Sequence, residues 1–466
     1  MDIDVARKLI SKHVTGHGDF LRRNEIAKRY YETKNDILFR EKPKDEINPM
    51  RNADNRIAMG FYPLLVDQKT AYMFTAPPVF DLHDETLNKL VADTLGDGYK
   101  AKCQELATRA SNAGIGWIHY WGEDGKFQWA VVPSEQVIPI WDTKLNSRLM
   151  AVLRVYRQTD DETGDIYDIY EYWTETQCEA FKKKSEFTID EGLEWCPMFT
   201  DFYEAGESDA ANVYPHGFGE VPFIPFKNNI LCKSELERVK ELIDSYDKTY
   251  SGFMNDLEDI QEVIFILTNY GGEDLNKFLK DLKYYKAIQT EAISGDDKSG
   301  VSTLTIQIPV EARDKMLEIT RKAIFTMGQG VDPSQQGLDK TSGEAMKFVY
   351  SLLELKAGQT ETYFSIGFNQ LIRAILHFAG RETDNITQTW TRTSIKNDSD
   401  LVSMCANSVG IVSQKTNLSH HPFVEDVEEE IKQIEKEKKE QEEEMNPYGA
   451  GVVGFKDSNK QEGGEQ

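Results

Sequence analysis

The sequence predicts a multidomain chain of the α+β class, and three observations lead to this prediction. Apolar residues recur with the period of a helix from residue 3 onward, and the period changes to two at Gly116. A third pattern follows the strands, because a helix of some 37 residues begins after a glycine-rich loop at 328–342. The chain has 466 residues, which suggests two to four domains or one large domain with insertions.

Composition excludes a wholly disordered chain, because 39% of the residues are hydrophobic and 11% are aromatic. The formal charge of −25 argues against a protein that grips nucleic acid tightly, since that needs a basic surface. The five cysteines are scattered, which fits reduced thiols in a cytoplasmic compartment. We expect neither a signal peptide nor a membrane span, because the longest purely aliphatic or aromatic run is 263–267.

The first half of the chain divides into helices and then strands. Helical periodicity covers 3–33, 57–74, 85–95 and 99–112. A β-hairpin follows at 117–132, with its turn at 122–125, and further strands are expected at 149–158, 166–174, 176–183 and 186–189. This block carries most of the tryptophans. Aromatic side chains there could stack on bases or sugars, but we expect them to be core or subunit-contact residues.

The middle of the chain reads as two helices around an insertion. Residues 212–229 are an extended connector rich in glycine and proline. Ser234 and Glu237 form the pattern of a capping box, which starts a helix to about residue 260. Residues 263–309 are predicted to be a compact module with a strand at 263–267, a helix at 274–284 and strands at 286–292 and 301–308. Pro309 then starts a helix at 310–327.

The last third begins with the loop at 328–342, which has three glycines and one proline. A loop of this kind inside a folded chain is usually functional or disordered. The long helix runs from Ser342 to about Ala379, and a strand at 386–395 and helices at 398–410 and 413–420 follow. Residues 424–444 hold 11 acids against 4 lysines, with one apolar stripe in the first half. Residues 445–466 are predicted to be disordered.

No catalytic signature is present, so we expect a protein that is not an enzyme and needs no cofactor. One alternative is a metal-dependent nuclease or hydrolase built on the acidic helix, with Glu258 and Glu262 at ligand spacing. Another is a scaffold or coiled-coil assembly protein that uses 343–379 and 424–444. The sequence argues against the coiled-coil alternative, because a coiled coil needs apolar residues sustained over several heptads and residues 435–444 are all charged or polar.

Two helices around an insertion, then a loop and a very long helix, suit a ring of identical subunits better than a monomer. Five segments support this interpretation by resembling one family. They are Tyr30-Tyr31 with 35–38, then 55–57 with 66–69 and 72–74, then 217–222 with 226–229, then 243–246 with Ser251 and 255–258, and finally 342–347 with 352–356. The chain resembles the portal proteins of tailed bacteriophages, specifically the family typical of long-tailed phages of Gram-positive bacteria.

The resemblance implies a portal-type subunit whose parts follow one another along the chain. Residues 1–233 with 343–395 correspond to the wing, 234–262 and 310–327 to the two stem helices, 263–309 to the clip, 328–342 to the tunnel loop and 396–444 to the crown. Family members form rings, typically of twelve subunits, at one capsid vertex. The implied partners are further copies of the chain, double-stranded DNA, terminase, major capsid and scaffolding proteins and the head-tail adaptor. The implied location is the virion, with the host cytoplasm during assembly.

The resemblance also implies three groups of candidate residues. In the tunnel loop, weak phosphate contact and backbone freedom are assigned to Gly328, Gln329, Gly330, Ser334, Gln335, Gln336, Gly337 and Lys340. Basic stem positions are Arg238, Lys240, Lys248, Arg313, Lys315, Arg321 and Lys322, which either face the channel or pair with acids between subunits. Terminase docking is assigned to Glu273, Asp274, Lys277, Lys280, Asp296, Asp297 and Lys298.

The net charge has a different meaning for a conduit than for a DNA-gripping protein. Phosphates must slide past the wall of a conduit in both directions without being captured. An acidic wall leaves DNA its counterions and offers no deep electrostatic well. The charge therefore predicts transient passage of DNA and low affinity for free duplex.

Overall fold

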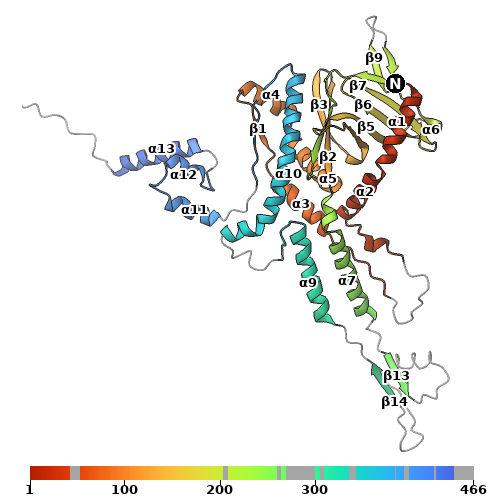
Figure 1. Cartoon of the computed structure of the whole chain (residues 1–466). Helices are drawn as coiled ribbons and strands as arrows, with labels where there is room; N and C mark the ends of the chain where they lie inside the picture. The colour runs from red at the N-terminus through yellow and green to blue at the C-terminus, as the bar shows by residue number, and fades with distance from the viewer. Residues whose placement is uncertain are drawn as a thin grey trace, which may run out of the picture. The chain divides into compact units, whose positions relative to one another are not determined.

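The computed structural model describes residues 1–41, 53–202, 208–259, 264–268, 300–304, 309–334, 343–383, 385–392, 398–424 and 427–445 (Figure 1). The chain forms two compact units. The first comprises residues 1–335 and 350–393, and the second comprises 336–349 and 394–466. No described helix is both long enough and apolar enough to cross a lipid bilayer.

The N-terminal helices follow the predicted periodicity, with two corrections. The pattern at 3–33 is two helices, α1 (Ile3–Gly16) and α2 (Gly18–Tyr31), which are separated at His17. Helix α3 (Phe61–Phe74) begins four residues later than expected, because the backbone N–H groups of Ile57 and Met59 bond to side chains of another helix. Helices α4 (Glu85–Leu95) and α5 (Tyr99–Ala113) lie where the sequence predicts them.

Most of the described strands form two antiparallel sheets in the first unit. The smaller sheet has the order β12-β2-β3, from Phe223–Lys227, Ile115–Glu123 and Lys126–Val132. The larger has the order β11-β7-β6-β5-β4, with β8 (Glu194–Trp195) on β7. Its strands are Val213–Pro215, Gln177–Lys184, Ile166–Trp173, Leu149–Thr159 and Val137–Trp141. The strand expected at 186–189 is absent from this described stretch, where a turn leads into α6 (Ile189–Gly192).

Several aromatic side chains of the strand block are core residues, and others are only partly buried. Trp117, Trp129 and Trp173 are buried, whereas Trp121 and Trp141 are partly exposed. A further two-stranded ribbon pairs β9 (Phe199–Phe202) with β10 (Ser208–Ala211).

The helix predicted from Ser234 has a break near its start. A 3₁₀ turn, η3 (Glu235–Arg238), precedes α7 (Lys240–Asp259). The Ser234 hydroxyl accepts the Leu236 N–H at 3.2 Å, while Glu237 pairs with Lys233 at 2.8 Å, so the predicted capping box is not formed. Helix α9 (Val310–Met327) lies beside α7 (Figure 1). In the region between them in sequence, β13 (Ile264–Thr268) pairs with β14 (Gly300–Leu304).

Helix α10 (Gly343–Phe378) confirms the predicted long helix. Its buried Phe364, Phe368 and Ile372 belong to a core that also includes Phe226 of β12 and Phe74 of α3. Within the described part of the expected return strand, residues 386–392, the strand is β15 (Thr387–Thr389), which pairs with β1 (Val79–Asp81). A second core joins α2, α3, η3, α7 and α9, and it packs the N-terminal end of α7 and the C-terminal end of α9 against α3.

The second unit is helical in its described part beyond residue 397. It contains α11 (Asp398–Asn407), α12 (Gln414–Ser419) and α13 (Val427–Met445). Val427, Ile431 and Ile434 form the apolar stripe of α13 and are half-buried. Helix α13 packs against α12, whereas the second half of α13 carries only polar and charged residues before Met445.

Candidate functional site

The segment that follows α9, residues 328–334, is called the loop root here, because it leads into the rest of the glycine-rich loop. Gly328 and Gly330 are buried against α3. A Cβ atom on Gly330 would lie 2.3 Å from Leu65 Cδ2, and one on Gly328 would lie 2.5 Å from Leu65 Cδ1. The two glycines therefore allow the backbone to approach α3 closely, and the expectation that they give the loop backbone freedom is wrong at these positions.

Gln329, between the two glycines, is held in an unusual conformation. Its φ is +53°, in the left-handed region that costs most residues free energy. Its side-chain oxygen accepts a hydrogen bond from Arg238 Nη1 at 2.8 Å. This bond links the loop root to η3, so the strained residue is stabilised by a contact from the start of the α7 segment.

Helix α3 contacts the loop root through Gln68. The Gln68 amide donates to the Val331 carbonyl at 2.7 Å and its oxygen accepts the Val331 N–H at 3.0 Å. This two-way contact satisfies the backbone of one residue in the way that a neighbouring strand would. The loop root is thus bonded at Gln329 and at Val331 by two different elements.

Helix α9 contacts the loop root through Arg321, whose guanidinium binds both carboxylate oxygens of Asp332 at 2.9 to 3.2 Å. The Asp332 carboxylate also accepts the Ser334 N–H at 2.9 Å and its hydroxyl at 2.8 Å. Burial alone would raise the pKa of Asp332, but the bonds from Arg321 and Ser334 outweigh it and lower that pKa. Asp332 therefore remains charged and holds the segment in a turn.

A buried group of charges lies beneath the loop root, and we call it the lysine–glutamate cluster: Lys69 of α3, Glu235 of η3 and Lys356 of α10. One oxygen of Glu235 pairs with Lys69 and the other with Lys356. The side chains are 0%, 11% and 9% exposed in the order Lys69, Glu235, Lys356. Lys69 also donates to Asn228 Oδ1 at 2.8 Å, and Lys356 donates to the Gly328 carbonyl at 3.0 Å.

The cluster places two positive charges around one negative charge. Burial would raise the pKa of Glu235, but the charges of Lys356 and Lys69 lower it to about 2. Burial lowers the pKa of Lys69, although Glu235 opposes this effect. Glu235 is therefore ionised, and three segments that are far apart in sequence meet at its carboxylate.

A second polar network occupies one face of α7, and we call it the backbone-binding face: Asp247, Ser251 and Asn255. These side chains accept the N–H groups of Met59, Ile57 and Asn55 at 2.9, 3.0 and 2.6 Å. Four helical residues rise about 6 Å and two extended residues span about 6.6 Å, so successive turns of α7 meet alternate residues of 55–59.

Other side chains extend this network at the N-terminal end of α7. Asn35 donates to Asp247 Oδ2 at 2.6 Å, and Tyr30 donates to Asp244. Lys240 bridges Asp36 at 2.6 Å and Asp244 at 2.7 Å. Burial raises the pKa of Asp247 to about 6, against the opposing hydrogen bonds from Asn35 and Met59.

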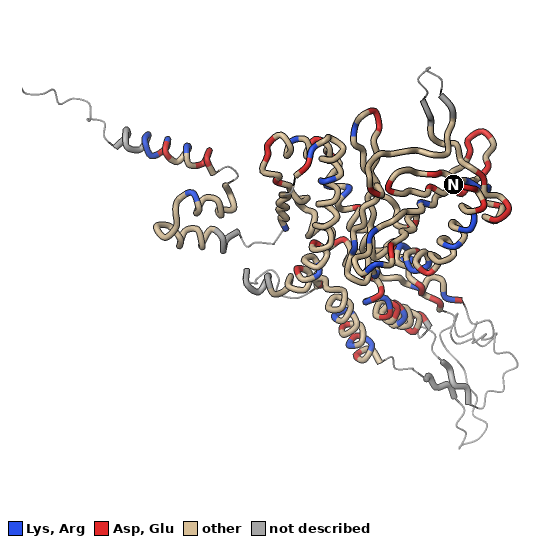
Figure 2. The backbone as a smooth tube through the Cα atoms, turned by 45° about the horizontal axis from the view of Figure 1, so that its top comes forward, with Lys and Arg blue, Asp and Glu red and all other residues tan. Residues whose placement is uncertain are grey.

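The basic stem candidates fall into two groups. Lys240, Arg313, Lys315 and Arg321 pair with acids of the same chain, and Arg238 bonds to Gln329. The partners of Arg313 and Lys315 are Asp256 and Glu318. Lys248 and Lys322 are exposed and form no ion pair with any residue that the structure describes. Charges of both signs follow α7 and α9 (Figure 2).

Several candidates lie outside the described residues. They are Gln335, Gln336, Gly337 and Lys340 of the loop and Glu273, Asp274, Lys277, Lys280, Asp296, Asp297 and Lys298 of the insertion. Glu262, one of the two acids of the nuclease alternative, also lies outside, and the other, Glu258, accepts from the Asn55 amide at 2.7 Å. Within the described ranges, no group of three or more acids, histidines or cysteines is arranged to hold a metal ion.

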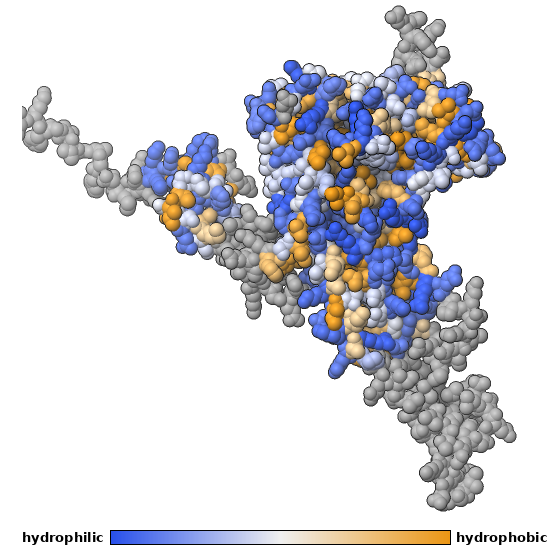
Figure 3. Space-filling view, viewed as in Figure 1, coloured by the Kyte–Doolittle hydropathy of each residue, from blue (hydrophilic) through white to orange (hydrophobic). Residues whose placement is uncertain are grey.

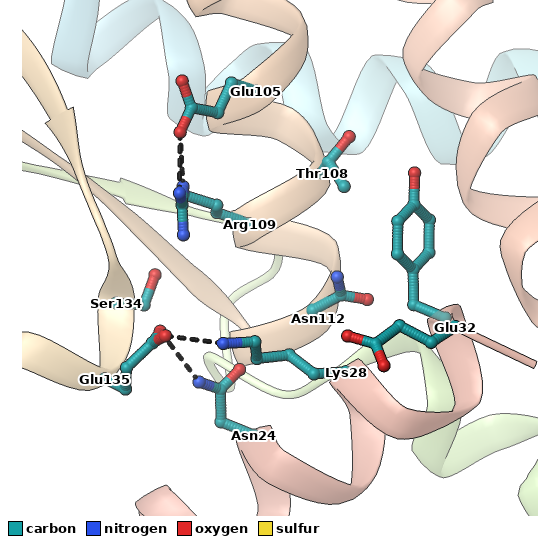
Figure 4. A pocket seen from close by; sticks show the side chains of 10 residues that line it. Asn24, Lys28, Glu32, Glu105, Thr108, Arg109, Asn112, Ser134 and Glu135 are labelled. Carbon is teal, nitrogen blue, oxygen red and sulfur yellow. Dashed lines mark hydrogen bonds and ion pairs between the residues drawn. The ribbon is translucent and has the colours of Figure 1, made fainter. Parts of the chain in front are cut away.

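A hollow of about 260 Å³ lies between α2, α5 and the turn η2 (Ser134–Gln136) (Figure 4). Most of its charged side chains bind one another. Glu135 accepts from Lys28 at 2.7 Å and from Asn24 at 3.3 Å, and Arg109 donates to Glu105 at 2.8 Å (Figure 4). The bonds to Glu135 join α2 to η2, and we assign the hollow no ligand.

The sequence candidates did not include Lys69, Glu235, Lys356, Gln68 or Asp247. A signal for one of them was available, because Lys69 lies among Leu65, Val66, Tyr72 and Met73 on an otherwise apolar helix face. Segments that carried the resemblance also meet in space. Lys69 and Lys356 of two such segments belong to the lysine–glutamate cluster, and Asn228 of a third accepts from Lys69. Tyr30, Asn35-Asp36, Asn55 and Ile57 contact the α7 segment.

Comparison with known proteins supports the family that these segments suggested. The family model described as "Phage portal protein, SPP1 Gp6-like" matches residues 11–444. A portal protein of Clostridium phage phiCD119 is 42% identical over 94% of this chain and 97% of its own length. The portal protein of Bacillus phage SPP1 is 32% identical over 90% of this chain and 83% of its own length.

Solved structures of lower similarity include a chain from the neck of an empty GTA particle. It is 11% identical with a TM-score of 0.46, and the match covers 77% of this chain and 88% of that chain. The two phage relatives and the family model span nearly the whole sequence, so the assignment depends on them. The chain therefore belongs to the phage portal proteins, in the SPP1 Gp6-like family.

Proposed function

We propose that this portal protein assembles into a ring, with twelve copies expected, at one vertex of the capsid, and that double-stranded DNA enters and leaves through its channel. The observation that carries the proposal is the match of residues 11–444 to the portal family, together with a 42% identical portal protein of almost equal length. The ring is located in the virion after assembly in the host cytoplasm.

Surface features of α9 support self-association. Beside the face that packs on α7, the helix carries a second apolar stripe at spacings of four and three residues: Ala312, Met316, Ile319, Ala323 and Met327. Met316, Ile319 and Met327 are 46%, 55% and 55% exposed. Figure 3 shows apolar residues among hydrophilic ones on the surface of this part of the first unit. A helix with apolar residues on two faces is usually covered on both, which a neighbouring subunit would do.

The domain roles that we propose follow the order of the chain. Residues 1–233 and 343–395 are the wing, α7 and α9 belong to the stem, 263–309 is the clip and 396–444 is the crown. The part of 328–342 beyond the loop root is the tunnel loop that meets passing DNA. The charge of −25 supports contact that is weak and independent of sequence.

Proposed partners follow from these roles. The clip docks the terminase during packaging and the head-tail adaptor afterward, and the other surfaces contact scaffolding and major capsid proteins during procapsid assembly. We assign the portal itself no catalytic step and no cofactor. The energy for DNA movement would come from the terminase.

Ring formation is tested by native mass spectrometry and negative-stain imaging of the full-length protein. We expect closed rings near twelvefold with a central hole. A monomer at every concentration, combined with a failure to enter procapsids, would contradict the proposal.

The tunnel-loop role is tested by deleting residues 335–341, which keeps the loop root and the start of α10. We expect rings to form normally and DNA packaging or retention to fall severely. The control is a deletion of equal length between residues 446 and 466. Loss of ring formation in the loop deletion alone would sink the assignment of this segment to DNA contact.

A further inference from the structure

We propose that Lys356 is a positioning residue that fixes the loop root from α10, with Glu235 as its counter-charge. The inference rests on the proposed function, because the loop root leads into the segment that we expect to meet DNA. It adds to that function a specific link between α10, η3 and the start of the tunnel loop.

The first step is the contact itself. Lys356 Nζ donates to the Gly328 carbonyl at 3.0 Å, and both residues are buried. Gly328 is the C-terminal cap of α9, and the orphan carbonyls at a helix end are satisfied by just such donors. Removing this ammonium group would leave a buried carbonyl without its charged donor, which weakens the hold on the segment.

The second step is the geometry around Gly328. The next residues are held by Arg238 at Gln329, Gln68 at Val331 and Arg321 at Asp332. Gln329 has a positive φ, so the segment keeps its shape only while its surroundings hold it. Lys356 is the contact to the loop root that comes from the long helix, and Glu235 ties it to η3. A shift of α10 relative to η3 would therefore move Gly328.

The third step is an internal control that the cluster supplies. Lys69 and Lys356 are both buried and both pair with Glu235, but Lys69 donates its other bond to Asn228 and not to the loop root. Replacing either lysine by methionine leaves one lysine and one glutamate, which is a neutral pair. The two variants thus share the loss of one buried charge and differ in the contact with Gly328.

The experiment measures hydrogen–deuterium exchange of residues 328–334 in assembled full-length protein. We expect Lys356→Met to accelerate exchange at Gly330 and Val331 by at least roughly tenfold, because a charged hydrogen bond to the segment is lost. Lys69→Met should exchange there as the wild type does. Lys356→Arg, which keeps a charged donor, should remain close to the wild type.

Equal exchange in Lys356→Met and the wild type would overturn the proposal. Accelerated exchange of the loop root in Lys69→Met would also overturn the proposal. The test can therefore fail even if Lys356→Met does not fold. In packaging assays, Lys356→Met should reduce packaged or retained DNA more than Lys69→Met, and equal yields would overturn the role in DNA passage. If wild-type rings package no DNA, the proposed function fails, while the exchange result still decides the link.

Discussion

The two polar networks around η3 and α7 hold their segments by opposite means. In the lysine–glutamate cluster, two buried lysines, from α3 and α10, share the carboxylate of Glu235 in η3. On the backbone-binding face, Asp247, Ser251 and Asn255 each hold one N–H group of an extended segment. Both ion pairs of the first network depend on the single carboxylate of Glu235, whereas the second network consists of separate hydrogen bonds.

This difference affects how each region tolerates change. Removing Glu235 would leave two buried lysines without a counter-charge, which is strongly destabilising. Removing one acceptor of the backbone-binding face costs the free energy of a single hydrogen bond, and the neighbouring bonds remain. We therefore infer that the cluster fixes the loop root in one arrangement, while the α7 face stabilises 55–59 in graded steps.

The largest effect is expected for Glu235→Gln. The substitution leaves Lys69 and Lys356 buried beside each other without a counter-charge, so we expect a loss of about 3–5 kcal/mol in the free energy of unfolding. Thermal and denaturant unfolding at fixed protein concentration measure it. The matched control is Glu237→Gln in the same turn, where the carboxylate is 31% exposed and pairs with Lys233. Similar losses in both variants would mean that the cluster is no more critical than a surface pair.

A smaller effect is expected from pH, through Asp247. Burial raises the pKa of this carboxyl to about 6, above the ordinary value of 3.8. A raised pKa in the folded state contributes stability that is complete below about pH 4 and is lost as the pH rises through 6. The shift corresponds to at most about 3 kcal/mol.

The comparison is between the wild type and Asp247→Asn, measured as unfolding free energy from pH 4 to 7. We expect the wild type to lose stability relative to the variant as the pH rises. A difference that stays constant with pH would show that Asp247 does not titrate in this range, and a difference of opposite sign would contradict the burial argument.

The smallest effect is expected for Ser251→Ala, which removes the acceptor of the Ile57 N–H group. We expect a loss of about 1 kcal/mol, the usual contribution of one hydrogen bond. Ser245→Ala, earlier on the same helix, is the control. The double variant with Asn255→Ala should lose nearly the sum of the two single losses, since the hydrogen bonds act separately. A strongly non-additive result would remove the contrast between the two networks.

Much of the fold could be predicted from periodicity, because long regular elements leave a regular pattern. Helix α10, the hairpin of β2 and β3 and the strands β5, β6 and β7 lie close to the predicted ranges. Predictions failed where contacts between distant segments decide the backbone. Residues 57–60 carry helical periodicity, yet the N–H groups of Ile57 and Met59 are taken by α7, about 190 positions later.

The candidate site was less predictable for the same reason. The composition of 328–342 identified the loop, but it also suggested flexible glycines at Gly328 and Gly330, where the structure has tight packing on Leu65. Lys69, Glu235 and Lys356 are separated by more than a hundred residues from one to the next, and no local spacing predicts that they meet. Basic stem residues were predicted as a group, and pairing within the subunit separates Lys248 and Lys322 from the rest.

The pairing of α7 with residues 55–59 also depends on a near match between two periods. A helix advances about 6.0 Å in four residues and an extended chain about 6.6 Å in two, so each further contact is displaced by about 0.6 Å. From Met59 to Asn55 the displacement adds up to only about 1.2 Å by that estimate, so side chains four positions apart on α7 can reach alternate N–H groups. Sliding the segment by one residue would instead present side chains and carbonyl groups where Asp247, Ser251 and Asn255 need N–H groups. The match of the two periods thus fixes the alignment of residues 55–59 along α7.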